Sequence, residues 1–468
     1  MTRVSSVVII GGGPGGYEAA LVARQLGAEV TLIERTGVGG SAVLTDVVPS
    51  KALIASAASI SAAQAGVALG VLVNGEHQSN GALTADVGMV NARVRDLAQA
   101  QSNDITHRLV REGVHIVHGT ARLVDATTVT VAAESGAEMT LLADNILIAT
   151  GTRPRVLDDA RPDGKRVLTW KQLYDLPELP ERLIVVGSGV TGAEFASAYN
   201  GLGSEVTLVS SREHVLPGED PDAAQVLEDV FARRGVTVLG NSRAVAARNT
   251  GDGVEVTLED GRVIEGSHVL VAVGSLPNTE HLGLEAVGVA LDDRGYLTVD
   301  RVSRTNVRGI YAAGDCTGVL PLASVAAMQG RIAMHHALGD AVSPLNTKLV
   351  SSAIFTDPEI AAVGYSQKDI DAGILRAEVY TLPLATNARA KMEGITDGFV
   401  KIMCRRGTRI VCGAVVVAPH ASELIHGLAI AYEQNITVDE LAQTFTVYPS
   451  LSGSIAEAAR RLRKPDTE

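Results

Sequence analysis

Short apolar runs, glycine-rich turns and amphipathic stretches alternate along the chain, and the first such group lies near the N-terminus. Ser6 to Ile10 form an apolar run typical of a buried parallel strand. The pattern that follows predicts a helix from about Gly13 to Leu26, ended by Gly27, and a second strand from Glu29 to Ile33. Strand, helix and strand in this order predict an α/β fold with a parallel sheet.

Three glycines join the first strand to the helix: Gly11, Gly13 and Gly16, in the spacing Gly-x-Gly-x-x-Gly. The first permits a tight turn, the second lets the backbone approach a pyrophosphate at the helix N-terminus, and the third lets helix and strand pack closely. Glu34 ends the second strand, where a carboxylate can bind both ribose hydroxyls of a nucleotide. The arrangement predicts a dinucleotide site; the alternative is a tight packing turn.

A second group of the same kind follows in the stretch RLIVVGSGVTGAEFASAYNGLGSEVTLVSS. Gly187, Gly189 and Gly192 repeat the glycine spacing, but Ser210 stands where the first group has its acid. An acid there would repel a ribose 2′-phosphate, whereas hydroxyl groups and Arg212 can accept one. We therefore expect NADPH to bind, with NADH also accepted; the alternative is that Arg212 is a solvated surface charge. Two dinucleotide sites imply two nucleotides, usually FAD and a nicotinamide cofactor.

The C-terminal part has a different pattern. Gly413 to Val417 predict a strand, Ala421 to Gln434 predict a helix, and Ile455 to Leu462 predict a terminal helix. The last few residues are charged, and we expect them to fray.

The composition fits a large globular protein. The chain has 468 residues, of which 46% are hydrophobic, which suits two to four packed domains. The 48 glycines suit tight strand-to-helix turns rather than disorder. The net charge is −13 and no Lys/Arg cluster is present, so we expect no binding to nucleic acid or to anionic lipid.

The three cysteines, Cys316, Cys404 and Cys412, have no close redox spacing. We expect small buried side chains rather than disulfides or a zinc site, and no metal site is predicted. The apolar N-terminal run passes directly into the glycine loop, unlike a cleaved signal peptide. No other apolar run approaches the ~20 residues of a membrane span, so we expect a cytoplasmic protein without a span.

Further motifs give the chain a specific resemblance. They are ILIATGTRP, VAVGSLPN, GIYAAGDCTGVLPLAS, AIFTDPEIAAVG and APHASELI. Together with the two glycine groups, they make the chain resemble the pyridine nucleotide–disulfide oxidoreductases of the lipoamide dehydrogenase and glutathione reductase type, nearly from end to end.

The resemblance implies two Rossmann-like domains and a C-terminal α+β dimerisation domain. Residues 1–150 and 274–347 would form the two parts of an FAD-binding domain, and residues 151–273 an NAD(P)-binding domain. Residues 348–468 would form a dimerisation domain, so the partner would be a second copy of this chain, with a larger assembly left open.

The resemblance also implies which residues contact the cofactors. Asp315, for example, corresponds to the acid that touches the FAD ribitol. The set expected around FAD is Gly11, Gly13, Pro14, Gly15, Gly16, Glu34, Arg35, Gly40, Ser41, Lys51, Gly119, Thr150, Gly151, Asp315, Leu322, Ala323 and Ser324. The set expected around the nicotinamide cofactor is Gly187, Gly189, Val190, Thr191, Gly192, Ser210, Arg212 and Gly274.

The chain departs from the family at the residues with which other members reduce disulfides. Those members carry two redox cysteines, and here the positions are Ala42 and Val47 in GGSAVLTDVVPSKAL. Those members also carry a His–Glu pair near the C-terminus, and here Tyr448 and Gly453 stand in its place. Joint loss of the thiols and of the acid–base pair indicates a changed reaction, with a non-catalytic paralogue as the alternative.

Two residues of the flavin environment are retained. Lys51 resembles the lysine beside the flavin N5/O4 edge, and Glu194 resembles the glutamate that pairs with it. A lysine there would stabilise the reduced, anionic flavin. The alternatives are a helix-surface lysine for Lys51 and a first-turn helix acid for Glu194.

Without sulfur, electrons must leave the flavin directly, and a quinone needs no thiol relay. Ala42 and Val47 leave an apolar lining suited to a flat ring. Within the family, the chain resembles most the actinobacterial members that lack the disulfide and act as NAD(P)H:quinone reductases. We therefore predict an FAD-dependent NAD(P)H:quinone oxidoreductase, in which the partner subunit's Tyr448 donates a hydrogen bond to the quinone. A soluble pyridine nucleotide transhydrogenase and a non-enzymatic flavoprotein redox sensor are the alternatives.

Overall fold

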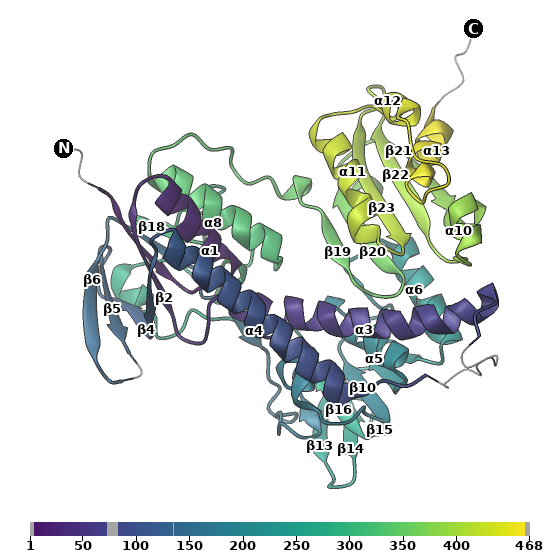
Figure 1. Cartoon of the computed structure of the whole chain (residues 1–468), viewed down its shortest axis with the longest axis horizontal. Coiled ribbons are helices and arrows are strands. Elements are labelled where there is room, and N and C mark those ends of the chain that lie inside the picture. Colours follow the sequence, from purple (N-terminus) through teal and green to yellow (C-terminus); the bar gives the residue numbers. More distant parts are fainter. Residues whose placement is uncertain (1–3, 73–82, 134, 464–468) are drawn as a thin grey trace. The chain divides into compact units, whose positions relative to one another are not determined.

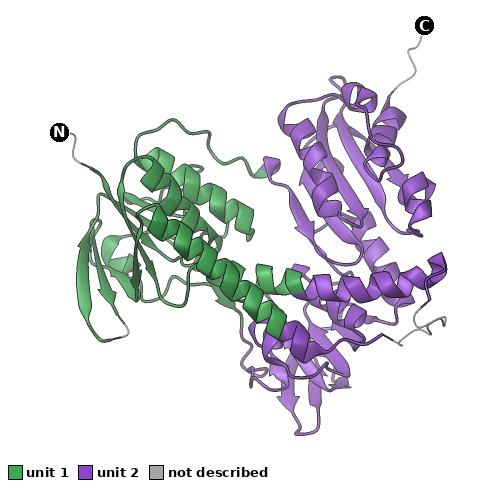
Figure 2. Cartoon of the chain, in the orientation of Figure 1, with its two compact units in different colours: residues 1–52, 92–155, 274–347 green, residues 53–91, 156–273, 348–468 purple. Residues whose placement is uncertain are grey.

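The structure is a computed structural model that describes residues 4–72, 83–133 and 135–463 (Figure 1). The expected fraying of the last residues concerns positions outside the described residues. The chain forms two compact units (Figure 2). The first unit comprises residues 1–52, 92–155 and 274–347, and the second comprises residues 53–91, 156–273 and 348–468. Two of the five boundaries between the units fall within the long helices α3 (Val47–Gly66) and α4 (Val87–Arg111).

The first unit is built on a five-stranded parallel sheet in the order β18-β7-β1-β2-β3. Its strands are β1 (Ser6–Ile10), β2 (Glu29–Glu34), β3 (His115–His118), β7 (Asn145–Ile148) and β18 (Ile310–Ala312). Alternate residues of β1 enter two different cores, as the strand period of two requires. Val7 and Ile9 pack with residues of the helices, and Val8 and Ile10 pack with residues of a small antiparallel sheet. The unit therefore has three layers.

The helical layer consists mainly of α1 (Pro14–Gln25) and α8 (Ala323–Ala337), which lie side by side (Figure 1). A side chain at Gly330 would overlap the carbonyl oxygen of Gly15, so glycine allows this close approach. The opposite layer is the sheet β4-β5-β6. The other elements of this unit are β4 (Thr120–Leu123), β5 (Thr128–Ala132), β6 (Glu138–Leu142), α2 (Gly40–Leu44), β8 (Thr152–Pro154), β17 (Ser275–Pro277), α7 (Leu284–Val287) and the 3-10 helix η3 (Asp315–Thr317).

The second unit contains another parallel sheet, in the order β12-β11-β10-β16-β9. A three-stranded antiparallel sheet, β13-β14-β15, packs its residues into the same core. The elements of this part are β9 (Val167–Leu168), η2 (Trp170–Asp175), β10 (Arg182–Val186), α5 (Val190–Leu202), β11 (Glu205–Val209), α6 (Pro221–Arg233), β12 (Thr237–Leu239), β13 (Ala244–Asn249), β14 (Val254–Leu258), β15 (Val263–Gly266) and β16 (His268–Val271).

The C-terminal part of the second unit is an antiparallel sheet in the order β19-β20-β23-β22-β21, with helices packed on it. Its strands are β19 (Ser352–Ile354), β20 (Glu359–Gly364), β21 (Ala377–Pro383), β22 (Phe399–Arg405) and β23 (Val411–Ala418). Its helices are α9 (Gln367–Asp371), α10 (Ala388–Met392), α11 (Ala421–Glu433), α12 (Val438–Gln443) and α13 (Gly453–Leu462). Short 3-10 helices occur at η1 (Val67–Leu69), η4 (Thr347–Leu349) and η5 (Leu384–Thr386).

A buried ion pair joins the two parts of the second unit. Lys401 on β22 is 1% exposed, and its Nζ lies 2.8 Å from both carboxylate oxygens of Asp220. Asp220 also caps helix α6, because its side chain accepts hydrogen bonds from the backbone N–H groups of Asp222 and Ala223. The ammonium and carboxylate compensate each other, as two buried charges must.

The predicted local elements are confirmed. The strands Ser6–Ile10, Glu29–Ile33 and Gly413–Val417 fall within β1, β2 and β23, and the three predicted helices are α1, α11 and α13. Gly27, predicted to end the first helix, has φ +84°, a left-handed conformation that favours glycine. The largest differences are two residues: α13 begins two residues before the predicted Ile455, and β23 begins two residues before the predicted Gly413.

The prediction that no other apolar run has the length of a membrane span is wrong. Among the residues that the structure describes, one helical stretch of 30 residues, Gly40–Leu69, is long and apolar enough, and only 11% of its most apolar window is buried. Alanine is its most frequent residue, and Lys51 lies within it, so a search for long runs of large apolar side chains overlooks it. Soluble proteins also contain such helices, so a single one is weak evidence for a span.

Candidate functional site

The first glycine loop, residues 11–16, lies between β1 and α1 at the carboxyl end of the parallel sheet. Gly11 has φ +105°, and a side chain on Gly16 would overlap the carbonyl oxygen of Gly11. A Cβ on Gly13 would meet nothing within 4 Å. Gly13 is also the N-cap of α1 and supplies no side-chain cap. Pro14 has no N–H, and Gly16 N donates to Gly13 O, so the N–H of Gly15 is the one in the first turn that keeps the capacity to bind an anion.

Glu34, at the end of β2, has a buried carboxylate beside this loop. Its Oε2 accepts a hydrogen bond from Gly12 N at 2.6 Å. Its Oε1 accepts from the backbone N–H groups of Arg35 and Thr36, each at 2.8 Å. Because a carboxylate oxygen can accept two hydrogen bonds, Oε2 keeps capacity for a ribose hydroxyl.

Other predicted residues of the first unit gather at the same edge of the sheet. A Cβ on Gly40 would come within 2.8 Å of the Cα of Gly13. Gly119 N donates to the carbonyl oxygen of Glu34 at 3.0 Å, and Thr150 follows β7, the strand beside β1. Thr150 Oγ1 donates to Asn278 O at 2.7 Å, and Asn278 Nδ2 returns a bond to Thr150 O at 2.9 Å.

Asp315 belongs to this edge as well. It follows β18 in η3, and burial raises the pKa of its carboxyl, partly offset by a hydrogen bond from Thr152 at 3.3 Å. Leu322, Ala323 and Ser324 begin α8, next in the chain. Arg35 and Ser41 are exposed, just after the end of β2 and in α2. The other members outside α3 are Pro14 and Gly15 in α1 and Gly151, which follows Thr150 and has φ +65°.

The second glycine loop, residues 187–192, repeats the first one closely. Gly187 has φ +114°, a side chain on Gly192 would overlap the carbonyl oxygen of Gly187, and a Cβ on Gly189 would meet nothing within 4 Å. Gly189 is the N-cap of α5, with Val190 and Thr191 in its first turn and again no side-chain cap. Both loops therefore place a helix N-terminus toward an anion, but Val190 at the start of α5 has an N–H to donate and Pro14 at the start of α1 does not.

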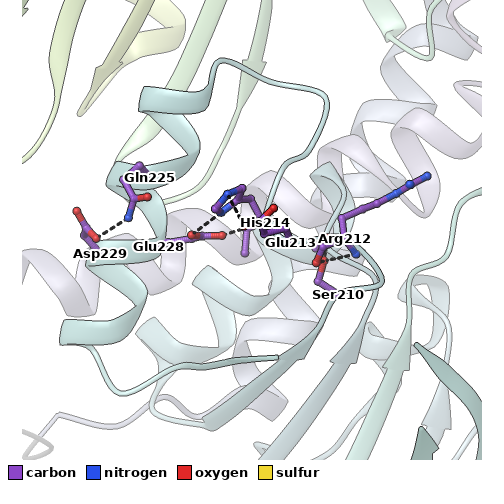
Figure 3. A network of polar contacts seen from close by, with 9 residues as sticks. Ser210, Arg212, Glu213, His214, Gln225, Glu228 and Asp229 are labelled. Carbon is purple, nitrogen blue, oxygen red and sulfur yellow. Dashed lines mark hydrogen bonds and ion pairs between the residues drawn. The ribbon is translucent and has the colours of Figure 1, made fainter. Parts of the chain in front are cut away.

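The two loops differ in what lies beside them. Ser210 is 0% exposed, and its Oγ lies 2.7 Å from Ser188 Oγ. Ser210 Oγ also donates to Arg212 O at 2.9 Å and accepts from Arg212 N at 3.1 Å (Figure 3). The hydroxyl is thus occupied within the protein, and it fixes the turn that carries Arg212. The Arg212 side chain is exposed, and among the described residues its guanidinium has no ion pair.

The positions of the absent redox cysteines lie in two successive helices, the short α2 and the long α3. Ala42 is in α2, and Val47 is the first residue of α3, 36% exposed. Lys51 follows one turn later in α3 and is half-buried. Gly274, expected at the nicotinamide cofactor, belongs to the first unit and has φ +96°.

Glu194 lies in α5 of the second unit and is 4% exposed. Its Oε1 accepts a hydrogen bond from Phe355 N at 2.9 Å, which ties α5 to the segment after β19. Lys51 belongs to the first unit, so the pairing of these two residues stays a prediction.

Tyr448 lies between α12 and α13, in a segment with strongly exposed apolar side chains. Phe445, Val447 and Tyr448 are 103%, 76% and 84% exposed. Asn387 holds the end of the segment through bonds to Ser450 O and Ser454 Oγ. The expected role of Tyr448 toward a partner subunit stays a prediction.

None of the three cysteines replaces the missing thiols. Cys316, Cys404 and Cys412 are all 0% exposed. Burial raises the pKa of the Cys316 thiol to about 11 and that of Cys412 to about 12, and it also raises the pKa of Cys404. A protonated, buried thiol is neither a nucleophile nor a redox relay.

Comparison with known proteins defines the class. Residues 5–330 match the family described as pyridine nucleotide-disulphide oxidoreductase, and residues 350–459 match the dimerisation domain of that family. The chain therefore belongs to the pyridine nucleotide-disulphide oxidoreductases, as its motifs predicted. This confirms the predicted fold class: two dinucleotide-binding domains and a C-terminal dimerisation domain.

Individual relatives are similar over nearly their whole length. The chain is 55% identical to an NAD(P)H dehydrogenase (quinone) of Mycobacterium tuberculosis, covering 99% of this chain and 95% of the relative. It is 33% identical to a dihydrolipoyl dehydrogenase of Zymomonas mobilis, covering 97% and 96%. The crystal structure of LpdA from Mycobacterium tuberculosis superposes with a TM-score of 0.93 at 55% identity, covering 98% and 100%.

Several residues that hold the second glycine loop and the segment around Asp315 in place were not identified from the sequence. Ser188 pairs with Ser210, Thr152 bonds Asp315, and Gln329 Oε1 accepts from Gly314 N at 2.9 Å. Ser188 could have been found from the internal repeat, because it precedes Ser210 by the same 22 positions that separate Gly12 from Glu34.

Proposed function

We propose that the protein is an FAD-dependent NAD(P)H:quinone oxidoreductase that transfers electrons without a thiol relay. One observation carries the proposal: both glycine loops are intact, whereas Ala42 and Val47 replace the redox cysteines and the remaining thiols are buried and protonated. A quinone fits this arrangement because it accepts two electrons and two protons directly. The name of the relative at 55% identity agrees with this activity.

The edge of the first unit that carries Gly13 and Glu34 is the proposed FAD site. The open N-terminus of α1 would face the pyrophosphate, Glu34 Oε2 would accept from the ribose, and Asp315 would accept from the ribitol. When bound, FAD supplies the hydride-accepting and electron-donating chemistry. The pKa of Asp315 is raised because its buried carboxylate is not fully hydrated. Hydrogen bonds from the ribitol hydroxyl groups would replace the missing water.

The second glycine loop is the proposed site for the nicotinamide cofactor. Its α5 N-terminus would hold the pyrophosphate, and the Arg212 guanidinium would bind a 2′-phosphate, so NADPH is used at least as well as NADH. Ser210 acts here by fixing the Arg212 backbone rather than by touching the phosphate, since its hydroxyl is buried.

Three residues are assigned to the reaction itself. Lys51, paired with Glu194, would supply positive charge at the flavin edge, and the partner subunit's Tyr448 would donate a hydrogen bond to the quinone. The assignment of residues 1–150 and 274–347 to FAD, 151–273 to NAD(P) and 348–468 to a homodimer interface belongs to the same proposal, as does a cytoplasmic location.

Turnover under anaerobic conditions tests the proposal. The purified holoenzyme should oxidise NADPH rapidly with menadione and should not oxidise dihydrolipoamide. Hydride transfer from NADPH to thio-NAD⁺ that is faster than menadione reduction would instead identify a transhydrogenase. A flavoprotein whose flavin NADPH reduces, but which turns over with neither acceptor, would be a sensor.

A further inference from the structure

We propose that Glu228 is a positioning residue for the cofactor 2′-phosphate, because its carboxylate holds the segment that carries Arg212. The proposal rests on the proposed function in one respect, the binding of NADPH at the second glycine loop. It adds a residue on a different element, helix α6, to the determinants of cofactor choice.

Glu228 lies in the middle of α6 and bonds both backbone and side chain of the segment after Ser210. Its Oε1 accepts from Val215 N at 2.7 Å, and its Oε2 lies 3.2 Å from His214 Nδ1 (Figure 3). With a proton on Nδ1, His214 donates this second bond. The Glu228 side chain is 18% exposed and Val215 is 0% exposed, so water does not readily replace the bond to Val215 N.

The same segment is fixed at both ends. Asn241 N donates to Arg212 O at 2.9 Å, in addition to the two bonds between Arg212 and Ser210. Leu216 N donates to Ser188 O at 2.8 Å, which ties the far end to the glycine loop itself. Glu228 holds the residues between these points. These bonds hold the backbone on both sides of the segment that carries Arg212 and His214.

The charged side chains next to Arg212 explain why the position of its backbone matters for phosphate binding. Glu213 lies beside Arg212 in the chain, its side chain is 76% exposed, and its Oε1 lies 3.8 Å from His214 Nε2. The Arg212 side chain extends away from Glu228 and is not neutralised by it (Figure 3). If the segment could rotate, the carboxylate of Glu213 could take the place of the Arg212 guanidinium beside the 2′-phosphate and repel it. Holding the segment lets the arginine bind the phosphate without first losing backbone freedom.

Glu228→Ala removes both bonds, and Glu228→Gln keeps an acceptor for Val215 N and should rescue binding. Asp229→Ala is the matched control, because Asp229 is the next residue on α6 and its carboxylate accepts from the exposed Gln225 Nε2 at 2.9 Å, away from the segment after Ser210. The probes are 2′,5′-ADP and 5′-AMP, whose affinities for the holoenzyme are measured by calorimetry. The ratio of the two affinities measures the contribution of the 2′-phosphate alone. A general loss of stability would weaken both ligands and leave this ratio unchanged.

We expect Glu228→Ala to weaken 2′,5′-ADP roughly tenfold and 5′-AMP less than twofold. The KM for NADPH should rise by a similar factor with little change for NADH, while Glu228→Gln and Asp229→Ala stay close to the parent. If Glu228→Ala binds 2′,5′-ADP as tightly as the parent protein, the proposal for Glu228 is overturned. The NADPH site itself still stands in that case if Arg212→Ala loses the preference for 2′,5′-ADP over 5′-AMP. If the parent protein shows no such preference, the NADPH assignment itself fails.

Discussion

Ser188 and Ser210 occupy the places that Gly12 and Glu34 hold in the first glycine loop. Both pairs are 22 residues apart and both connect the loop to the end of the second strand. In the first pair a carboxylate accepts a hydrogen bond from the loop and is proposed to bind the ribose of FAD, and in the second two hydroxyl groups bond each other and leave no negative charge. On the proposed assignment of FAD and NADPH, a change of two residues would thus fit one repeated framework to a different nucleotide.

At the same scale, Lys51 and Glu194 are predicted to act as a pair. Lys51→Met should lower the flavin reduction potential and slow flavin reduction by NADPH about a hundredfold, since one preorganised charge contributes on the order of 3 kcal/mol. Glu194→Gln should shift both quantities in the same direction, and the double variant should be less than additive. Reductive titration and stopped-flow absorbance measure them.

Lys165→Met removes an exposed lysine and is the control for this pair. Wild-type rate and potential in both Lys51→Met and Glu194→Gln would mean that the two residues only pack. Quinone affinity should change little in either variant, because the acceptor is expected on the flavin face that the redox disulfide covers in other members of the family.

At the scale of elements, the strand–loop–helix turn uses each glycine differently. A side chain at Gly16 would overlap a carbonyl oxygen of the turn, whereas one at Gly13 would meet no protein atom. Gly16 therefore serves the packing of α1 on β1, and Gly13 leaves room for a ligand. The second loop has the same division between Gly192 and Gly189.

This division predicts separable effects. Gly16→Ala should lower the free energy of unfolding of the FAD-free protein by about 1–3 kcal/mol, the usual cost of overpacking. Gly13→Ala should leave that quantity within about 0.5 kcal/mol but should lose FAD, since the methyl group would meet the pyrophosphate. Gly189→Ala should keep FAD and bind NADPH weakly. Urea unfolding and FAD content check these outcomes; normal FAD content in Gly13→Ala would contradict them.

A second prediction at this scale concerns the buried ion pair between β22 and the cap of α6. Lys401→Met leaves the Asp220 carboxylate buried without its cation and should cost about 3–5 kcal/mol in the free energy of unfolding. Adding Asp220→Asn should recover part of the loss, because asparagine also caps helices. Urea unfolding of the holoenzyme measures both.

Lys348→Met is the comparison for this pair. It breaks a more exposed pair, in which Lys348 Nζ lies 2.9 Å from Asp369 Oδ2, and should cost no more than about 1 kcal/mol. Equal losses in Lys348→Met and Lys401→Met would show that burial adds nothing to the Lys401 pair.

At the scale of the whole molecule, the sequence predicted what depends on local pattern. The strands, helices and glycine turns around residues 6–34 follow from side-chain period and from glycine conformation, both of which are local. Glu228 and Lys401 could not be predicted, because their partners lie 13 and 181 positions away and are selected by tertiary packing. The exposure of the alanine-rich α3 could not be predicted either, because its apolar composition suggests a buried helix.

The central claim is that electrons pass from the reduced flavin to a quinone with no sulfur between them. Its most direct test is anaerobic stopped-flow mixing: the flavin is reduced with one equivalent of NADPH, and the product is mixed with menadione or with lipoamide. We predict no thiolate-to-flavin charge-transfer band after reduction, complete reoxidation by menadione at a rate that accounts for steady-state turnover, and no reoxidation by lipoamide. A charge-transfer band together with reoxidation by lipoamide would contradict the account.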